Sequence, residues 1–165
     1  MEQLCPWESA QYFVYSSNIP TLFFYSHIPA IIAALLVGFV VFYKSNKSRV
    51  GITLLSISIL FSAWSVLDLI LWATNKPDVV LFFWSLQILF EPLIYLMCFC
   101  LVYFFVKDND VPFGGKIILL LLYSPIILLL ATNYSLTGVD INFCNATEGF
   151  IAQYFTYIVE LLSII

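Results

Sequence analysis

Three carboxylates lie within long apolar stretches of this 165-residue chain: Asp68, Glu91 and Glu160. A charged side chain at the centre of a bilayer costs at least ~2.5–3.5 kcal/mol on insertion scales, so each of these positions needs a physical reason. The acids can form a polar cavity that binds a small ligand or responds to protonation. Alternatively, they can hydrogen-bond between helices and hold a bundle together. The sequence leaves both interpretations open.

Aromatic and polar side chains recur around these acids at the spacing of a helix face. In the second apolar stretch, Trp64, Asp68 and Trp72 follow one another every four residues. In the third stretch, Trp84, Gln87, Glu91 and Tyr95 follow at intervals of three or four residues and share one helix face. The residues of the candidate cavity are therefore Trp64, Asp68, Trp72, Trp84, Gln87, Glu91, Tyr95 and Glu160.

The second and third stretches are joined by a short turn, so we expect them to be antiparallel neighbours. Counting about 1.5 Å per residue from that turn places Asp68 at the level of Trp84 and Gln87. The same count places Trp64 near Glu91. Because no Lys or Arg lies within an apolar stretch, we expect none of the three acids to have a cationic partner in this chain.

Pro92 directly follows Glu91 and is expected to bend the third stretch. A proline has no N–H to donate to the carbonyl four residues back, here that of Ile88. The bend would open space beside Glu91 and leave one acceptor for a ligand, a water or the Glu91 proton. Glu160, counted inward from the start of the fifth stretch, reaches about the level of Glu91.

Five apolar stretches must position these residues, and they run over residues 28–43, 50–74, 79–106, 117–132 and 150–165. A hydrophobic content of 62%, a mean hydropathy of +1.01 and a charged fraction of 10% exclude an ordinary soluble domain. A helix needs ~20 apolar residues to cross a bilayer, a length that the first stretch reaches if residues 21–25 are included. Continuous apolar runs also exclude the alternating pattern of a membrane barrel.

The sequence therefore predicts an all-α polytopic membrane helical bundle. It forms one domain over residues 1–165, with an amino-terminal segment over 1–27 and five spans over 28–165. The fifth stretch has no polar flank, so we expect the chain to stop within a span. No basic patch interleaved with aromatic residues supports nucleic-acid binding.

The six basic residues indicate the orientation. Five would share one side of the membrane, and these are Lys44, Lys47, Arg49, Lys107 and Lys116. Only Lys76 would lie on the other side. Short loops rich in Lys and Arg stay cytoplasmic, so we predict a multi-pass protein of the cell membrane with its amino terminus outside.

Cys5 and Cys144 both fall outside in this topology. They can form a disulfide in an oxidising compartment or remain free thiols, and the sequence does not decide between the two. With a single histidine, His27, and no Cys/His cluster, we expect no metal site and no cofactor. No catalytic motif is present, so we expect no enzymatic activity from this chain.

The order of these segments resembles the amino-terminal seven-span sensor region of bacterial histidine kinases. The resemblance rests on a first span that closes on FYKSNKSR and a second that reads SISILFSAWSVLDLILWAT. It continues in a third with a central proline, WSLQILFEPLIYLMCFCLVYFF, and a fourth that ends in LLLATNYSLTGV. The chain would cover spans one to five of the seven.

The resemblance implies a sensory input module of a two-component receptor, embedded in the lipid bilayer. It would detect an extracytoplasmic or intramembrane stimulus, such as an unknown small ligand, and pass it to a cytoplasmic output domain. The full-length receptor would act as a homodimer. The alternative is a fragment of a transporter that uses the intramembrane carboxylates as a proton or cation relay, and such a relay would have to connect both membrane faces.

Overall fold

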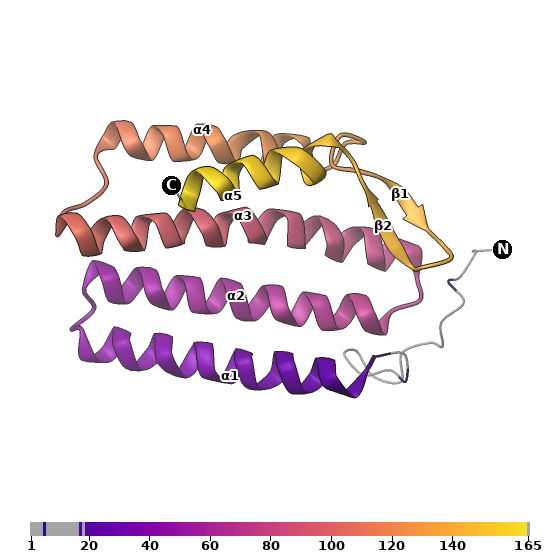
Figure 1. Cartoon of the computed structure of the whole chain (residues 1–165), viewed down its shortest axis with the longest axis horizontal. Coiled ribbons are helices and arrows are strands. Elements are labelled where there is room, and N and C mark those ends of the chain that lie inside the picture. The colour runs from indigo at the N-terminus through magenta and orange to yellow at the C-terminus, as the bar shows by residue number, and fades with distance from the viewer. Residues whose placement is uncertain (1–4, 6–16, 18, 165) are drawn as a thin grey trace.

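The computed structural model describes Cys5, Ser17 and residues 19–164, and this part of the chain is mostly helical (Figure 1). The helices are α1 Thr21–Lys44, α2 Arg49–Ala73, α3 Pro77–Lys107, α4 Phe113–Leu129 and α5 Thr156–Ile164. A short π-helical segment, η1 Ile151–Phe155, leads into α5. Most of the predicted amino-terminal segment before Thr21 lies outside the described residues.

Local signals set the ends of the long helices. The Ser48 hydroxyl accepts a hydrogen bond from the Gly51 N–H at 3.2 Å, which caps the start of α2. Pro77 opens α3, where its missing N–H is not needed in the first turn. At the other end of α3, Asp108 takes a left-handed conformation with φ 50° and ends the helix.

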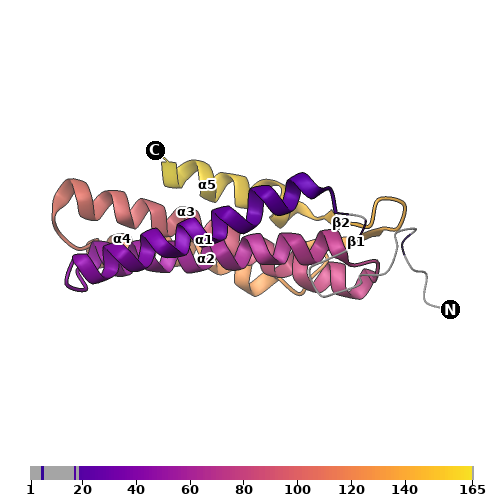
Figure 2. The same cartoon turned by 90° about the horizontal axis from the view of Figure 1, so that it is seen from below.

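The helices run along one long axis, and α1, α2 and α3 form a row (Figures 1 and 2). Helix α1 packs on α2, α2 packs on α3, and α3 contacts both α4 and α5. We call the end that holds the α2–α3 turn (residues 74–76) and the β-strands the hairpin end. The opposite end, which holds the turns over residues 45–48 and 108–112, is the basic end.

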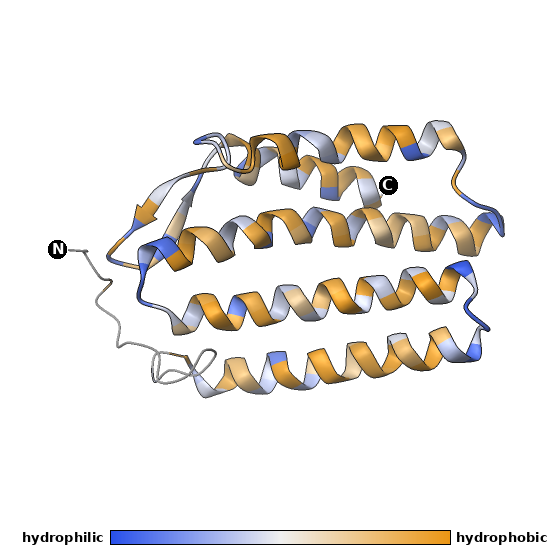
Figure 3. Cartoon of the chain, turned by 180° about the vertical axis from the view of Figure 1, so that it is seen from behind, coloured by the Kyte–Doolittle hydropathy of each residue, from blue (hydrophilic) through white to orange (hydrophobic). Residues whose placement is uncertain are grey.

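Hydrophobic residues make up most of the helices, and the hydrophilic residues gather largely in the turns (Figure 3). Leu36, Val102 and Leu120 are each at least 60% exposed. Such a surface is unfavourable in water but suits a hydrocarbon environment. Helices α1, α2 and α3 are long and apolar enough to cross a membrane.

The helices at the fourth and fifth predicted spans are shorter than a full membrane crossing. Helix α4 has 17 residues and α5 has nine, so neither reaches the ~20 residues of a typical span. The first span is longer than its predicted core over 28–43, because α1 already begins at Thr21 and Pro29 lies inside it. Residues 21–27 therefore belong to a helix and not to a separate surface segment.

A β-hairpin is the main departure from the all-α prediction. Strand β1 Leu136–Asp140 pairs antiparallel with β2 Asn145–Glu148, with Val139 opposite Ala146. The Thr137 hydroxyl lies 2.9 Å from the Thr147 hydroxyl across the pair. β-Branched residues favour strands, and Thr137, Val139 and Thr147 occupy the segment between the fourth and fifth predicted spans.

Small residues allow α1 and α2 to approach closely. A Cβ atom added at Gly38 would lie 2.6 Å from Ser58 Oγ and 2.8 Å from Ser58 Cβ. Close approach at small residues is typical of helix pairs in membranes, where van der Waals packing drives association. Gly38 is also the one buried residue of α1, which otherwise presents half-buried and exposed side chains.

Ionic contacts organise the basic end. Asp110 accepts a hydrogen bond from Lys116 at 2.8 Å and lies 3.7 Å from the Arg49 guanidinium. The hydrogen bond and charge of Lys116, assisted by Arg49, hold the pKa of the Asp110 carboxyl below its usual range. The α3–α4 turn is thereby linked to the first residue of α2.

Replacement of Gly38 tests the close approach of α1 and α2. Gly38→Ala is expected to lower the free energy of unfolding by about 1–3 kcal/mol, because the added methyl group overpacks the interface. Thermal unfolding in detergent, followed by tryptophan fluorescence, would measure the change. The double variant Gly38→Ala/Ser58→Gly should recover much of the loss, since it removes the two atoms that the methyl group would meet.

Gly114→Ala is the matched control, because a Cβ atom at Gly114 meets nothing within 4 Å. This variant should unfold at the temperature of the unmodified protein. Equal unfolding temperatures for Gly38→Ala and Gly114→Ala would contradict the packing described here.

Candidate functional site

Asp68 connects three helices near the hairpin end. Its Oδ2 lies 3.0 Å from Nε2 of His27 on α1, and its Oδ1 accepts a hydrogen bond from the Gln87 side-chain amide on α3 at 3.3 Å. The carboxylate itself comes from α2. A single side chain is therefore bonded to both neighbours of the central helix in the row.

The surroundings of His27 define its role in this contact. An ionised carboxylate only accepts hydrogen bonds, so Nε2 bears the hydrogen when it faces ionised Asp68. The other ring nitrogen, Nδ1, lies 2.9 Å from Ser26 Oγ and 3.0 Å from the Phe23 carbonyl oxygen. Both ring nitrogens therefore have polar neighbours, and the ring is held in one orientation.

The contact with His27 corrects the expectation that no acid has a cationic partner in the chain. His27 and Asp68 are 41 residues apart and form an ion pair when the imidazole is protonated. We missed it because we counted only Lys and Arg and assigned His27 to the amino-terminal segment. The apolar residues 21–25, which lengthen the first stretch to a full span, were the signal that places His27 on a helix.

Aromatic side chains surround this polar cluster. The Phe23 ring stacks on His27 with a centroid distance of 5.1 Å and contacts Trp72 at 4.6 Å. On the other side, the Trp84 indole N–H donates to Glu148 Oε1 at 3.1 Å. This last bond connects α3 to strand β2, so the hairpin is bonded to the helix that also carries Gln87.

A pocket of about 260 Å³ opens beside Asp68. It is lined by Asp68, Leu71, Trp72, Trp84, Cys144 and Asn145. Three of these residues, Asp68, Trp72 and Trp84, belong to the candidate cavity predicted from the sequence. The hairpin supplies the other wall, through the residues at the start of β2 and just before it.

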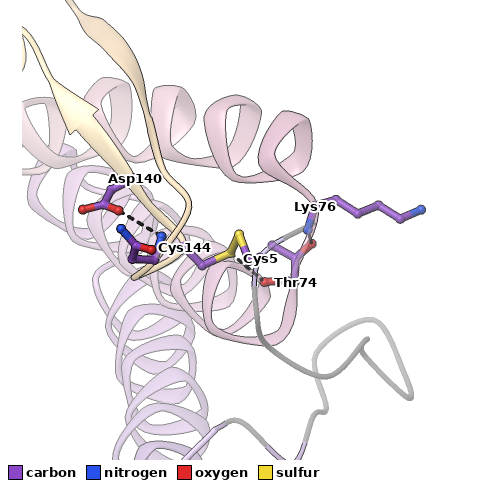
Figure 4. The surroundings of a disulfide bond; sticks show 6 residues. Cys5, Thr74, Lys76, Asp140 and Cys144 are labelled. Carbon is purple, nitrogen blue, oxygen red and sulfur yellow. Dashed lines mark hydrogen bonds between the residues drawn. A yellow bond between two sulfur atoms is a disulfide. The ribbon is translucent and has the colours of Figure 1, made fainter. Parts of the chain in front are cut away.

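A disulfide between Cys5 and Cys144 holds the hairpin over this end (Figure 4). The two Cα atoms are 5.5 Å apart, and both residues are buried. The Cys5 N–H donates to the Asn75 carbonyl at 3.1 Å, and Cys144 Sγ lies 3.7 Å from the Thr74 carbonyl oxygen. The bridge therefore rests on the α2–α3 turn, next to the pocket.

The remaining predicted residues lie outside the lining of this pocket. Glu91 is half-buried on α3 and close enough to Asp68, Glu148 and Glu160 to interact with them electrostatically. Tyr95 is likewise close enough to Glu91 and Glu160 to interact with them electrostatically.

Trp64 also lies apart from the pocket lining. Its indole Nε1 is buried and has no hydrogen-bond partner among the described residues. Of the eight predicted residues, three line the pocket, Gln87 is bonded to Asp68, and Glu91, Tyr95 and Glu160 interact with one another electrostatically.

Pro92 is fully buried within a helix that continues on both sides of it. The Tyr123 hydroxyl on α4 donates to the Leu89 carbonyl at 2.9 Å, one turn before the proline. The Leu89 carbonyl is next to that of Ile88. The Ile88 carbonyl receives no hydrogen bond from Pro92, because proline has no N–H. A neighbouring helix therefore donates to the backbone one residue away from the Ile88 carbonyl.

The described residues contain no group of three or more His, Cys, Asp or Glu placed to hold a metal ion. Cys98 and Cys100 are free thiols on α3. The chemistry that the site offers is recognition, through one carboxylate, an amide, an imidazole and two indoles.

Alkylation of the four cysteines tests the disulfide. In protein purified and unfolded without reductant, only Cys98 and Cys100 should react with a maleimide, and all four should react after reduction. Mass spectrometry would count the adducts. The variant Cys144→Ser should show three reactive thiols without reductant, because Cys5 then loses its partner. Four adducts on the unreduced, unmodified chain would exclude the bridge.

No protein-family model, no curated protein and no solved structure matches the chain. Its function must therefore be argued from the geometry itself.

Proposed function

We propose that this chain is a membrane-embedded sensory module, of the kind that precedes the output domain of a histidine kinase. In this proposal a stimulus acts at the pocket of the hairpin end. The helices carry the response to the basic end, where an output domain would receive it. The observation that carries the proposal is the position of Asp68, which lines the pocket and is bonded to both α1 and α3.

The proposed orientation places the hairpin end outside the cell. Five of the six basic residues lie at or beside the basic end, and such residues favour the cytoplasmic side. The disulfide lies at the other end, and disulfides persist in oxidising compartments. Charge and redox chemistry therefore support the same orientation, by independent arguments.

The bonding pattern suggests how a signal would leave the pocket. A ligand that contacts Asp68 competes with or strengthens its bonds to His27 and Gln87. These residues lie on α1 and α3, which extend to the basic end at Lys44 and Lys107. Small shifts of packed helices, of about 1–2 Å, are a common means of transmission between distant sites.

A transporter would need polar groups along the whole path between the two ends. A second cavity of about 410 Å³ lies toward the basic end, between α3 and the end of α5. No carboxylate lines it, and apolar side chains such as Phe99 and Val102 form much of its wall. The described lining of this cavity offers no acid that would extend a relay, which favours the sensor over the transporter as the proposal.

Distance measurements between spin labels test whether the two ends are coupled. Labels at Tyr43→Cys and Asn109→Cys would report on α1 and α3 at the basic end, in a background where Cys98 and Cys100 are alanine. Asp68→Asn is expected to shift the interspin distance by about 1–2 Å or more, because it weakens the bonds between the three helices. Electron–electron double resonance in nanodiscs would measure it.

Asp78→Asn is the matched control, since Asp78 is an exposed acid in the first turn of α3 at the same end and does not line the pocket. It should leave the distance unchanged. An unchanged distance in folded Asp68→Asn protein would contradict coupling and leave Asp68 with a purely structural role. Proton or cation flux in proteoliposomes that Asp68→Asn abolishes would favour the transporter.

A further inference from the structure

The hairpin-end pocket combines a carboxylate with two indole rings and lacks a fixed positive charge. Asp68, Trp72 and Trp84 line it, and no Lys or Arg does. Lys76 lies in the α2–α3 turn at the hairpin end. Its side chain extends away from the disulfide beside the pocket (Figure 4). The charge of the lining is therefore negative or, when His27 is protonated, neutral.

Asp68 retains the capacity to bind a further donor. An ionised carboxylate offers about four acceptor positions on its two oxygens, and among the described residues each oxygen has one hydrogen-bond partner. Its side chain is 22% exposed, so it is accessible from the pocket. A cationic group entering the pocket can therefore interact with Asp68 without displacing His27 or Gln87.

The indoles add a second kind of attraction for the same charge. The face of a tryptophan ring attracts cations more strongly than the face of a tyrosine or phenylalanine ring. Cages built from aromatic side chains bind alkylammonium groups. The Trp84 N–H is already bonded to Glu148, a second carboxylate at the rim. An anionic ligand would face two carboxylates in this place, whereas a cation is complementary to both.

A metal ion is less suited to the pocket than an organic cation. Hard metal ions need several oxygen ligands around them, and Asp68 is the one carboxylate that the described part of the chain contributes to the lining. Leu71 and the two indoles supply apolar surface instead. This mixture matches a group that is charged and carries methyl or methylene surface.

We propose that the hairpin-end pocket binds an alkylammonium group, either of a small free amine or of a lipid headgroup. The positive nitrogen lies against Asp68 and between Trp72 and Trp84. The inference deepens the proposed sensory function, on which it rests, by naming the chemical class of the stimulus. In a volume of about 260 Å³ the ligand is small, or only its headgroup enters.

Calorimetry with choline and its neutral isostere, 3,3-dimethyl-1-butanol, tests the charge requirement. The full chain is placed in phosphatidylglycerol nanodiscs, which contain no ammonium headgroup. Choline should bind at least about tenfold more tightly than the isostere, the scale expected of a desolvated cation–π site with a carboxylate. Addition of phosphatidylcholine to the nanodisc should reduce choline binding if lipid headgroups occupy the site.

Variants assign the binding to this pocket. Asp68→Asn and Trp72→Leu should each weaken choline binding about tenfold, and the control Asp78→Asn should not change it. Asp68→Asn also disturbs the helix contacts, so weaker binding in this variant has two explanations. The comparison of choline with its isostere uses unmodified protein and therefore tests the charge requirement independently. Equal binding of the two ligands, tighter binding of acetate, or no measurable binding of choline would overturn the assignment.

The spin-label distance at the basic end distinguishes a failure of this inference from a failure of the proposed function. If choline does not bind but Asp68→Asn still shifts the distance, the ligand class is wrong and the coupling stands. If choline binds and the distance never changes, the pocket is an alkylammonium site and the sensory role fails.

Discussion

The arrangement of the first three helices depends on the contacts that the Asp68 carboxylate makes. This carboxylate lies on the central helix of the row and bonds to His27 on one side and Gln87 on the other. In an apolar environment an unpaired carboxylate is costly, so the bonds that it makes are retained. Together with the close approach at Gly38 and the contact of Phe23 with Trp72, this polar contact fixes where α1 lies along α2.

The hairpin and its disulfide lie beside the same carboxylate. Strand β2 is bonded to α3 through Glu148 and Trp84, and the Cys5–Cys144 bridge rests on the α2–α3 turn. The helix row therefore supplies the carboxylate and the indoles of the pocket, and the hairpin closes one side. A group bound in this pocket would lie beside Cys144, the indoles and the shared carboxylate.

Sequence reasoning located Asp68 and its partner Gln87 at one level, because the short α2–α3 turn and the helical rise determine the register of neighbouring helices. It also placed Cys5 and Cys144 on one side of the predicted topology, though it left their pairing open. It did not find His27, since a contact over 41 residues depends on how α1 packs and not on any local pattern.

Two further features also lay beyond the sequence argument. The hairpin was missed because its strands are only five and four residues long and lie in a polar segment. The Tyr123 hydroxyl beside Pro92 depends on the packing of α4, which no spacing within α3 can indicate. Residues within one helix or across a short turn were predictable, whereas contacts between elements distant in the chain were not.

Nitrogen NMR of the single histidine tests the central interaction most directly. With ¹⁵N-histidine incorporated, the spectrum contains only His27, so its ring signals need no assignment. The account predicts a hydrogen on Nε2 and a clear change in the Nε2 shift in Asp68→Asn, with no change in Asp78→Asn. An identical His27 spectrum in the Asp68→Asn variant would show that the two side chains do not interact.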